Sequence, residues 1–445
     1  MTESNVMYNN SSISKQKLVK SVSLSSSLFD KLIDELLIEI LIRLPLKPAS
    51  LCKCVSSRFR SLISSSYFIN CYKIHHNQNH YPFNNPFALY YQSKPNYDNM
   101  IQPSAMEIDL IFESPVFESP RFNLSFISYN YNYSDNDNEE LEEHSLQYLA
   151  SNNGLVLCCV ALRRPVVYFV CNPLTKQYVV LPLPPSNVKS VFIGFICEPQ
   201  HDYDDGRDTS FKVVRIEAVK SESERHLSGT LKFDIFCSLL GRWTEEYFMS
   251  SSRFNPELFY CKNYRHHSAV VCNGLLHWDT LSTCGIFTYD PYNGECRTVE
   301  LPNEIRKPVW ACKHFLGESN GLLRYANISW DDSSYKVWEL KDNGNGGEWL
   351  LVHKVRLDEM ESTVPNINKD CLGLLFPHLL NQDIVYFWCR SLSKVVEYNM
   401  RDKVLKLPCF IRHVKMITPL SPMFFPFVLP FWPTEVPRIE QHDTS

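Results

Sequence analysis

Two groups of histidine and cysteine residues have side chains that could hold a metal ion. They are His266, His267, Cys272 and His277 in the second half of the chain, and His75, His76 and His80 near its start. Zinc sites use these residue types at a few recurrent spacings, and neither group matches one. The first group also lies in a β-rich region, where alternate residues point to opposite faces of a strand. We therefore expect structural histidines and no metal site.

The sequence lacks the short motifs that build the common catalytic sites. It has no GxSxG, no Walker loop and no GxGxxG, and only 14 of its 445 residues are glycine. Copper or flavin chemistry on a β-rich fold would need ligands that we cannot identify in this sequence. We expect no catalytic residue and no cofactor, and we do not expect an enzyme.

Charge and hydropathy limit the kinds of partner. The formal net charge is only −5, with 44 basic and 49 acidic residues, whereas binding to nucleic acid calls for a concentrated basic surface. A membrane-spanning helix needs about 20 apolar residues in succession. The apolar stretch 34–46 is too short, and the apolar tail 416–433 contains five prolines. We expect neither nucleic acid nor membrane as a partner.

The 16 cysteines are scattered and include no CxxC pair. A disulfide framework usually accompanies a small secreted domain with a signal sequence, and the first 20 residues contain no apolar core of the required length. Free thiols in a reducing compartment are the better interpretation. We expect a cytoplasmic or nuclear protein, or one found in both compartments.

The most unusual element that the sequence predicts is a short, very apolar helix. In "DELLIEILIRLPLK" (34–47), Glu35, Glu39 and Arg43 form one narrow polar stripe. Apolar residues fill about two thirds of the circumference, where a surface helix usually has a narrower apolar stripe. They are Leu36, Leu37, Ile38, Ile40, Leu41, Ile42 and Leu44.

Two further short helices are expected up to residue 70. Pro45 ends the first helix and Pro48 begins the next one. An apolar face then recurs at Leu51, Val55, Phe59 and Leu62. The basic residues of this stretch read as a solvated helix face, and they are Lys47, Lys53, Arg58 and Arg60. Because so small a unit cannot cover this much apolar surface alone, either the rest of the chain or a second protein must cover it.

From about residue 85 the pattern changes to short β-branched and aromatic runs. Examples are VVYFV (166–170), FKVVRI (211–216) and IVYFWC (384–389), and clusters of Gly, Pro, Asn and Asp separate them. Short strands at regular spacing with turn signals between them indicate an all-β architecture.

This region also contains internal repeats. Strands open at Asn153-Gly154, Asn273-Gly274 and Asn320-Gly321. Two of these are followed by a turn with Asx and proline, at Asn172-Pro173 and Asp290-Pro291. The spacing of the second and third openings fits a propeller blade of roughly 40–50 residues. An irregular β-sandwich is the alternative. Five tryptophans could pack between blades or anchor a binding face: Trp278, Trp330, Trp338, Trp349 and Trp388.

Residues 28–70 resemble an F-box. The matching elements, in order, are Leu32-x-Asp34-Glu35-Leu36-Leu37, Glu39-Ile40-Leu41, Arg43-Leu44-Pro45, Cys54-Val55-Ser56 and Ser61-Leu62-Ile63. Ile33 stands where the family usually has proline, and Phe59 stands in place of its usual tryptophan. Residues 85–415 resemble the F-box-associated domain of plants, a kelch-related module. "SNNGLVLC…VYFVCNPLTKQYVVLP" (151–182) shows this most clearly, and "VCNGLLHW…IFTYDP" (271–291) follows in the expected order.

The resemblance implies a substrate-recognition adaptor of an SCF-type ubiquitin ligase. The F-box would dock on a Skp-family linker protein and through it on a cullin scaffold, while the β domain would hold an unknown target protein for ubiquitination. The residues that we expect to contact the linker protein are Leu32, Ile33, Leu36, Ile40, Leu44, Pro45, Val55 and Phe59. For each of them, packing inside the helical unit is an open alternative.

The expected organisation is α + β in separate domains. It comprises a leader (1–27), a three-helix F-box (28–70), a linker (71–84), a β-propeller-like, kelch-related domain (85–415) and a proline-rich tail (416–445), which either packs on the β domain or hangs free. A second reading is a propeller that binds a small ligand or a glycan and has no part in ubiquitination. In that reading the helical unit is only a packing element, already covered by its own chain.

Overall fold

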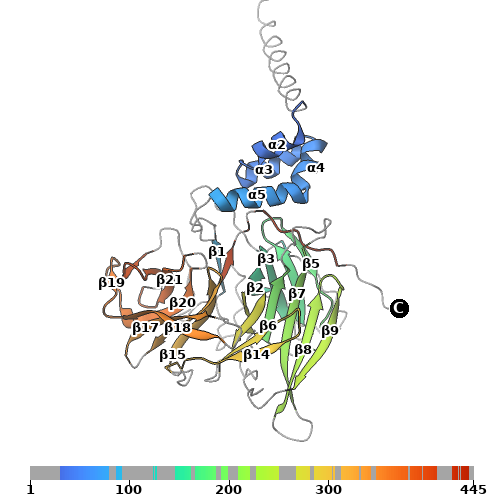
Figure 1. Cartoon of the computed structure of the whole chain (residues 1–445). Coiled ribbons are helices and arrows are strands. Elements are labelled where there is room, and N and C mark those ends of the chain that lie inside the picture. Colours follow the sequence, from blue (N-terminus) through green and yellow to red (C-terminus); the bar gives the residue numbers. More distant parts are fainter. Residues whose placement is uncertain are drawn as a thin grey trace, which may run out of the picture. The chain divides into compact units, whose positions relative to one another are not determined.

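In a computed structural model, the chain forms two compact units, Met1–Tyr81 and Pro82–Ser445 (Figure 1). Each unit is described by itself. The structure describes residues 31–79, 87–92, 124, 126–127, 146–161, 166–186, 192–198, 209–220, 227–249, 267–280, 285–302, 304–305, 312–329, 332–341, 347–378, 381–392, 394–407, 423–428, 430 and 432–439. The predicted leader 1–27 lies outside these residues, as do His80, His266 and Trp330.

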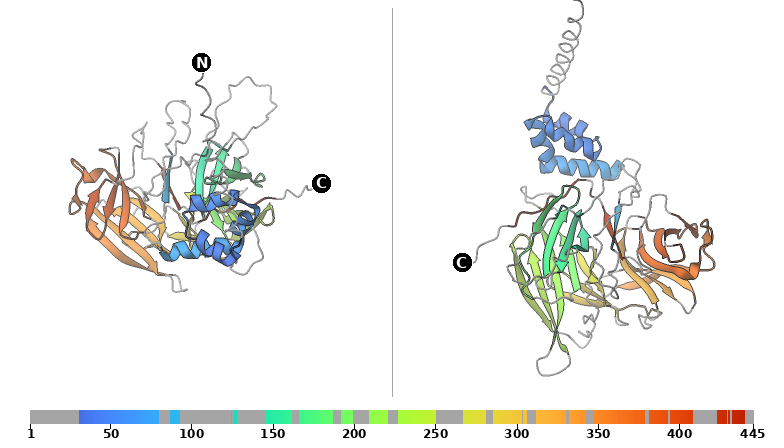
Figure 2. Two further views of the ribbon diagram at one scale, coloured as in Figure 1. Left: turned by 90° about the horizontal axis from the view of Figure 1, so that it is seen from above. Right: turned by 180° about the vertical axis from the view of Figure 1, so that it is seen from behind.

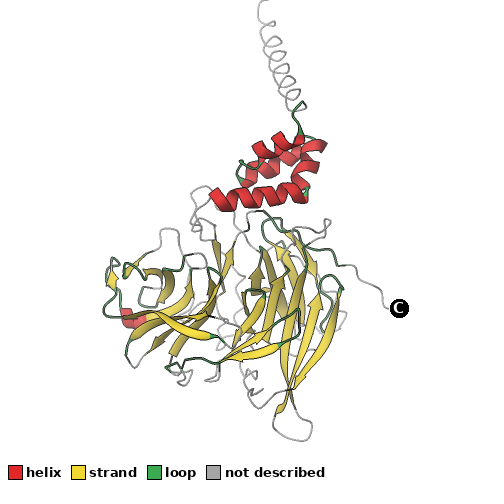
Figure 3. Ribbon diagram, in the orientation of Figure 1, coloured by secondary structure: helices red, strands yellow, loops and turns green. Residues whose placement is uncertain are grey.

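The first unit is helical over residues 34–79. Its elements are α2 (Asp34–Leu41), α3 (Leu46–Leu51), the 3₁₀ turn η1 (Cys52–Cys54), α4 (Ser57–Ser64) and α5 (Ser66–Asn79), drawn in red in Figure 3. The sequence predicts three helices within 28–70, and the structure has parts of four α-helices there, because α5 begins at Ser66. The structure adds α5, and this helix occupies the first nine residues of the stretch interpreted as a linker (71–84).

One detail of the helical prediction is wrong. The apolar positions from Leu51 to Leu62 do not form a single face, because the chain leaves the α-helical path after Leu51. Ser56 has extended backbone angles, and its hydroxyl accepts a hydrogen bond from the Phe59 amide at 3.2 Å, which caps the start of α4. The interruption turns Leu51 and Val55 outward while Phe59 is buried.

The second unit is built of β-sheets, drawn in yellow in Figure 3. Five of them have four or five strands each, and the four consecutive strands of a sheet pair antiparallel. The first sheet is β2 (Leu146–Asn152), β3 (Leu155–Ala161), β4 (Val166–Asn172) and β5 (Gln177–Val180). The second is β6 (Phe192–Cys197), β7 (Phe211–Lys220), β8 (Leu227–Cys237) and β9 (Arg242–Met249), with β10 (His267–Ser268) beside β6.

The other three sheets repeat this plan. The third is β11 (Val270–Cys272), β12 (Leu275–Asp279), β13 (Ile286–Tyr289) and β14 (Cys296–Val299). The fourth is β15 (Cys312–Ser319), β16 (Leu322–Ser329), β17 (Ser334–Lys341) and β18 (Glu348–Arg356). The fifth is β20 (Leu372–Pro377), β21 (Ile384–Cys389), β22 (Lys394–Asn399) and β23 (Val404–Lys406), with β19 (Glu361–Ser362) beside β23 and the 3₁₀ turn η4 (Lys369–Cys371) before β20.

The five sheets are the blades of a propeller. Their first strands lie next to one another in the order β2, β6, β11, β15, β20. Figure 2 shows the blades from above and from behind. The predicted all-β propeller is therefore confirmed as a five-bladed one, and the β-sandwich alternative is excluded.

The predicted turns occur where expected. The backbone φ is positive at both residues of Asn153-Gly154, Asn273-Gly274 and Asn320-Gly321, which close three hairpins. This conformation suits asparagine and glycine better than other residues and matches the twist of paired strands. At the Asx turns, the Asn172 side chain accepts the Leu174 amide at 2.8 Å, and Asp290 accepts the Tyr292 amide at the same distance.

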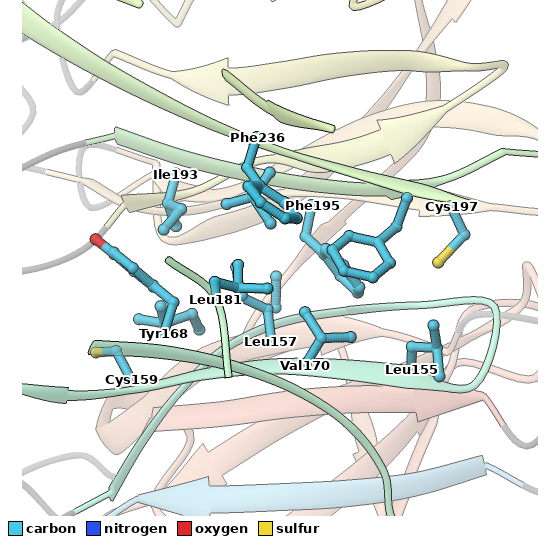
Figure 4. Packing of buried hydrophobic residues seen from close by; sticks show 14 of the residues in the cluster. Leu155, Leu157, Cys159, Tyr168, Val170, Leu181, Ile193, Phe195, Cys197 and Phe236 are labelled. Atoms are coloured by element: carbon cyan, nitrogen blue, oxygen red, sulfur yellow. The ribbon is translucent and has the colours of Figure 1, made fainter. Parts of the chain in front are cut away.

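The core of the propeller lies between neighbouring blades. Between the first and second, Leu157 and Val170 face Phe195 and Phe236 (Figure 4). Three of the tryptophans are buried in such packing, namely Trp278, Trp338 and Trp388, and Trp349 packs partly buried. This favours blade packing over surface anchoring for the four that the structure describes.

The proline-rich tail packs on the propeller, which settles an alternative that the sequence leaves open. Its strand β24 (Met423–Val428) pairs with β1 (Phe87–Gln92), and both strands lie against β2. Phe427 is fully buried against the first blade. Farther along, the Thr434 hydroxyl donates to the Asn153 carbonyl at 2.5 Å, and the Asn172 amide donates to the Thr434 carbonyl at 2.5 Å.

None of the helices that the structure describes combines the length and the apolar character needed to cross a bilayer.

Candidate interaction surface

Helix α2 buries one side of its apolar circumference and exposes another. Leu37, Ile38 and Leu41 are buried inside the helical unit. Ile33, Leu36 and Ile40 are 60%, 50% and 46% exposed, and their spacing of three and four residues puts them on one side of the helix. These three residues are called the α2 group below. Single exposed apolar residues are common on proteins, but three aligned on one short helix indicate an interaction surface.

Two more apolar side chains are exposed where α3 ends and α4 has not yet begun. Leu51 is 60% exposed and Val55 is 67% exposed. These two residues form the turn group. Leu51 is the last residue of α3, and Val55 follows the 3₁₀ turn η1.

Arg58 fastens α4 to the beginning of α2. Its guanidinium donates through Nε to Asp34 Oδ1 at 2.9 Å and through Nη2 to the Leu32 carbonyl at 2.5 Å. Such a pairing fixes the orientation of both groups, because the guanidinium donors have a rigid planar geometry. The sequence suggests only that Arg58 belongs to a solvated basic face. In the structure its side chain also joins two helices. It connects the helix that follows the turn group to the first turn of α2.

Side chains of α5 hold the other end of α2. The Tyr72 hydroxyl donates to the Leu44 carbonyl at 2.9 Å, and His76 Nε2 lies 2.9 Å from the Ile42 carbonyl. Carbonyls at a helix C-terminus lack partners within the helix, so these contacts satisfy groups that would otherwise need water. Burial raises the pKa of the Tyr72 phenol well above its usual range, which keeps it a neutral donor.

The structure divides the eight residues predicted to contact a linker protein into three classes. Ile33, Leu36, Ile40, Pro45 and Val55 are exposed, Leu32 and Leu44 are half-buried, and Phe59 is buried. Phe59 packs inside the helical unit, so it is unsuited to direct contact.

Leu51 was not among the predicted contact residues, although it is exposed. The signal for it was its position four residues before Val55, a residue that the prediction did include.

Two of the residues that could have bound a metal, His277 and Cys272, make other contacts. His277 Nδ1 lies 2.9 Å from the Thr288 hydroxyl in the buried interior, and the Cys272 thiol donates to the Gly321 carbonyl. Burial raises the pKa of the Cys272 thiol to about 12, so it stays protonated near neutral pH. In the part of the chain that the structure describes, no three His, Cys, Asp or Glu side chains lie together as metal ligands would.

Comparison with protein families gives two matches. Residues 29–70 match the F-box domain, and residues 120–416 match the family described as "F-box protein At3g26010-like, beta-propeller". The first match covers α2, α3 and α4, which carry the α2 group and the turn group, and ends within α5. The second covers all five blades.

Curated relatives agree with these matches. The chain is 27% identical to F-box protein At5g49610 of Arabidopsis thaliana over 58% of this chain and 66% of that protein. It is 26% identical to F-box protein At3g26010 of the same plant over 57% of this chain and 56% of the relative. The chain thus spans slightly less than two thirds of one relative and just over half of the other. Among solved structures, TolB from Acinetobacter baumannii has a TM-score of 0.35 at 11% identity, with 76% of this chain and 69% of TolB covered. This similarity is too low to support an argument.

Proposed function

The chain belongs to the family of F-box proteins with an At3g26010-like beta-propeller, and from this premise we propose that it is the substrate-recognition adaptor of an SCF-type ubiquitin ligase. In this proposal the helical unit docks on a Skp-family linker protein, which joins it to a cullin scaffold. The propeller, which we assign to the kelch-related F-box-associated group, holds the target protein. The ubiquitin transfer itself is carried out by other subunits.

The observation that carries the proposal is the exposure of the α2 group and the turn group. Burying an apolar side chain is favourable by about 25 cal/mol for each Å² removed from water, so five exposed side chains can drive a stable association once its costs are met. The hydrogen bonds that Arg58, Tyr72 and His76 make at the two ends of α2 support the same conclusion. A helix fixed at both ends presents its side chains in one geometry and loses less entropy on binding.

The proposal is tested by measuring the binding of a purified Skp-family protein to the full chain by calorimetry. Replacing Leu36 and Ile40 together with glutamate places two charges on the α2 group. We expect this variant to lose at least about 100-fold in affinity, since buried and unpaired charges are costly.

Leu350 on β18 provides a matched control. Its side chain is 46% exposed, as is that of Ile40, but it belongs to the propeller. Leu350→Glu should bind the Skp-family protein with unchanged affinity. If the unsubstituted chain and the double variant bind equally well, or if neither binds, the helical unit is not the docking element.

A further inference from the structure

The outer edges of four blades are protected against pairing with another strand. An exposed edge strand has unpaired amides and carbonyls, and proteins protect such edges with short strands, bulges or a covering segment. The edge strands β5 and β14 have four residues each. Strand β18 has nine, but a bulge at Val337/Trp338 breaks its register, and β23 is covered by β19.

Strand β9 of the second blade has none of these protections. It has eight residues, pairs with β8 in an unbroken register from Thr230↔Met249 to Cys237↔Arg242, and is the last strand of its sheet (Figure 1). Among the residues that the structure describes, no strand pairs with its outer side. Tyr247 and Met249, at its C-terminal end, are 61% and 79% exposed. The edge is therefore long and regular, with apolar side chains beside it.

Two adjacent glutamates at the middle of β9 determine which kind of strand could pair there. Glu245 and Glu246 point to opposite faces of the sheet. Glu245 lies 2.5 Å from the Lys232 ammonium, which partly neutralises it. Glu246 accepts a hydrogen bond from the Tyr289 hydroxyl at 3.4 Å and has no cationic partner among the described residues. The middle of the edge thus carries a net negative charge, while Arg242 lies at its N-terminal end.

These glutamates also disfavour the pairing of β9 with the β9 strand of a second copy of this chain. If two β9 strands paired antiparallel along their whole length, Arg242 would face Met249 and Glu245 would face Glu246. Like charges directly opposite each other destabilise a strand pair, and this register would place two such pairs at its centre. A strand with two adjacent basic residues would instead form two favourable pairs at the same positions.

We propose that the β9 edge binds an extended segment of the target protein, which adds a strand to the second blade. Main-chain hydrogen bonds to β9 give the affinity of such an interaction, and side chains beside the edge give its specificity. The segment has two adjacent Lys or Arg residues opposite Glu245 and Glu246. It also has β-branched or aromatic residues opposite Tyr247 and Met249. This inference rests on the proposed function, because it specifies what the propeller recognises.

The test uses the full chain and two blocked synthetic peptides. One is Val-Thr-Tyr-Lys-Lys-Thr-Val, and the other has both lysines replaced by glutamate. Hydrogen exchange of the β9 amides is followed as each peptide is added. We expect the lysine peptide to slow exchange in β9 and leave β18 unchanged, and to bind at least about tenfold more tightly than the glutamate peptide.

Three variants make the result specific. Replacing Glu245 and Glu246 with lysine should reverse the preference between the two peptides, and replacing both with glutamine should abolish it. Glu348→Lys on the bulged strand β18 is the matched control and should leave the preference unchanged. Equal binding of both peptides, no slowing in β9, or an unchanged preference in the lysine variant would each overturn the inference. So would protection of β9 that rises with protein concentration in the absence of peptide, because the occupant would then be a second copy.

Binding of a Skp-family protein is measured on the same preparations. The β9 variants should bind it as the unsubstituted chain does. If the unsubstituted chain binds the Skp-family protein but shows no preference between the two peptides, the strand inference alone is refuted. If it shows the preference but does not bind the Skp-family protein, only the adaptor function is refuted.

Discussion

Arg215 and Asp234 form an ion pair that is almost completely buried in the second blade. Arg215 Nη1 lies 2.8 Å from Asp234 Oδ2, and the two side chains are 1% and 3% exposed. Arg215 also donates to the Ser186 carbonyl at 3.1 Å, and its guanidinium lies 5.6 Å from the centre of the Tyr168 ring on the first blade. The pair therefore fixes the first blade, the connection after it and the second blade relative to one another.

Asp234→Ala is expected to lower the free energy of unfolding by about 3–5 kcal/mol, because it leaves a buried guanidinium without its counter-charge. The exposed pair Arg356–Asp358 is the control. Asp358→Ala should leave the unfolding free energy nearly unchanged, since water already screens that pair. Both values can be measured by urea denaturation. Equal effects of the two substitutions would show that the buried pair does not hold the blades together.

At the scale of the element, α5 is as much a part of the helical unit as the helices that match the F-box domain. The family match ends at residue 70, but Tyr72, beyond that end, is only 2% exposed. Because Tyr72 and His76 satisfy carbonyls at the end of α2, the α2 group depends on a helix that lies mostly outside the matched range.

Tyr72 and Tyr67 offer a matched comparison within α5. Tyr72→Ala should destabilise the helical unit by about 3 kcal/mol, because it removes a buried ring and a hydrogen bond. Tyr67 is 64% exposed, so Tyr67→Ala should have little effect. Hydrogen exchange of the α2 amides reports this local stability. If both substitutions left the exchange unchanged, α5 would be dispensable to the unit.

The elements differ in how well the sequence predicts them, for physical reasons. Asn-Gly turns and short β-branched and aromatic runs are local signals, so the strands of the blades are predictable from the sequence. The extent of α5 was missed because "SYFINCYKIHHNQN" is mostly polar. Phe68, Tyr72 and His76 nevertheless recur at every fourth position and were an available signal.

The tail was harder to predict than the blades. Its prolines exclude a helix and a central strand, yet Pro426 pairs with Leu89 in the two-stranded sheet of β1 and β24. Proline is tolerated in a strand only where one side of the backbone needs no partner. Which strand accepts such a tail depends on residues more than 300 positions away in the chain, and local patterns carry no information about that.

The candidate surface was predictable in composition but only partly in detail. An excess of apolar residues on α2 follows from the sequence alone. Which of them remain exposed depends on how α4 and α5 pack, and this packing buries Leu37, Ile38 and Leu41 and leaves Ile33, Leu36 and Ile40 open. For Phe59 the sequence left contact and internal packing open, and the structure buries it on α4, the helix that Ser56 caps.

At the scale of the whole molecule, the chain combines a small helical unit that exposes apolar side chains with a large propeller whose blades pack through buried apolar clusters. Successive blades from the first to the fifth share buried apolar clusters, and the tail covers the first blade with Phe427. This division of roles is what an adaptor requires: one unit to join a common scaffold and another to present a surface for a particular target.

The central claim is that the α2 group and the turn group are open in the free chain and covered by a linker protein. Hydroxyl-radical footprinting of the full chain, with and without a Skp-family protein, measures the accessibility of these side chains directly. We predict that Leu36, Ile40, Leu51 and Val55 are oxidised readily in the free chain and protected in the complex, while Phe59 reacts slowly in both. The account is contradicted if these four side chains are already protected in the free chain, or if they stay equally reactive when the linker protein is added.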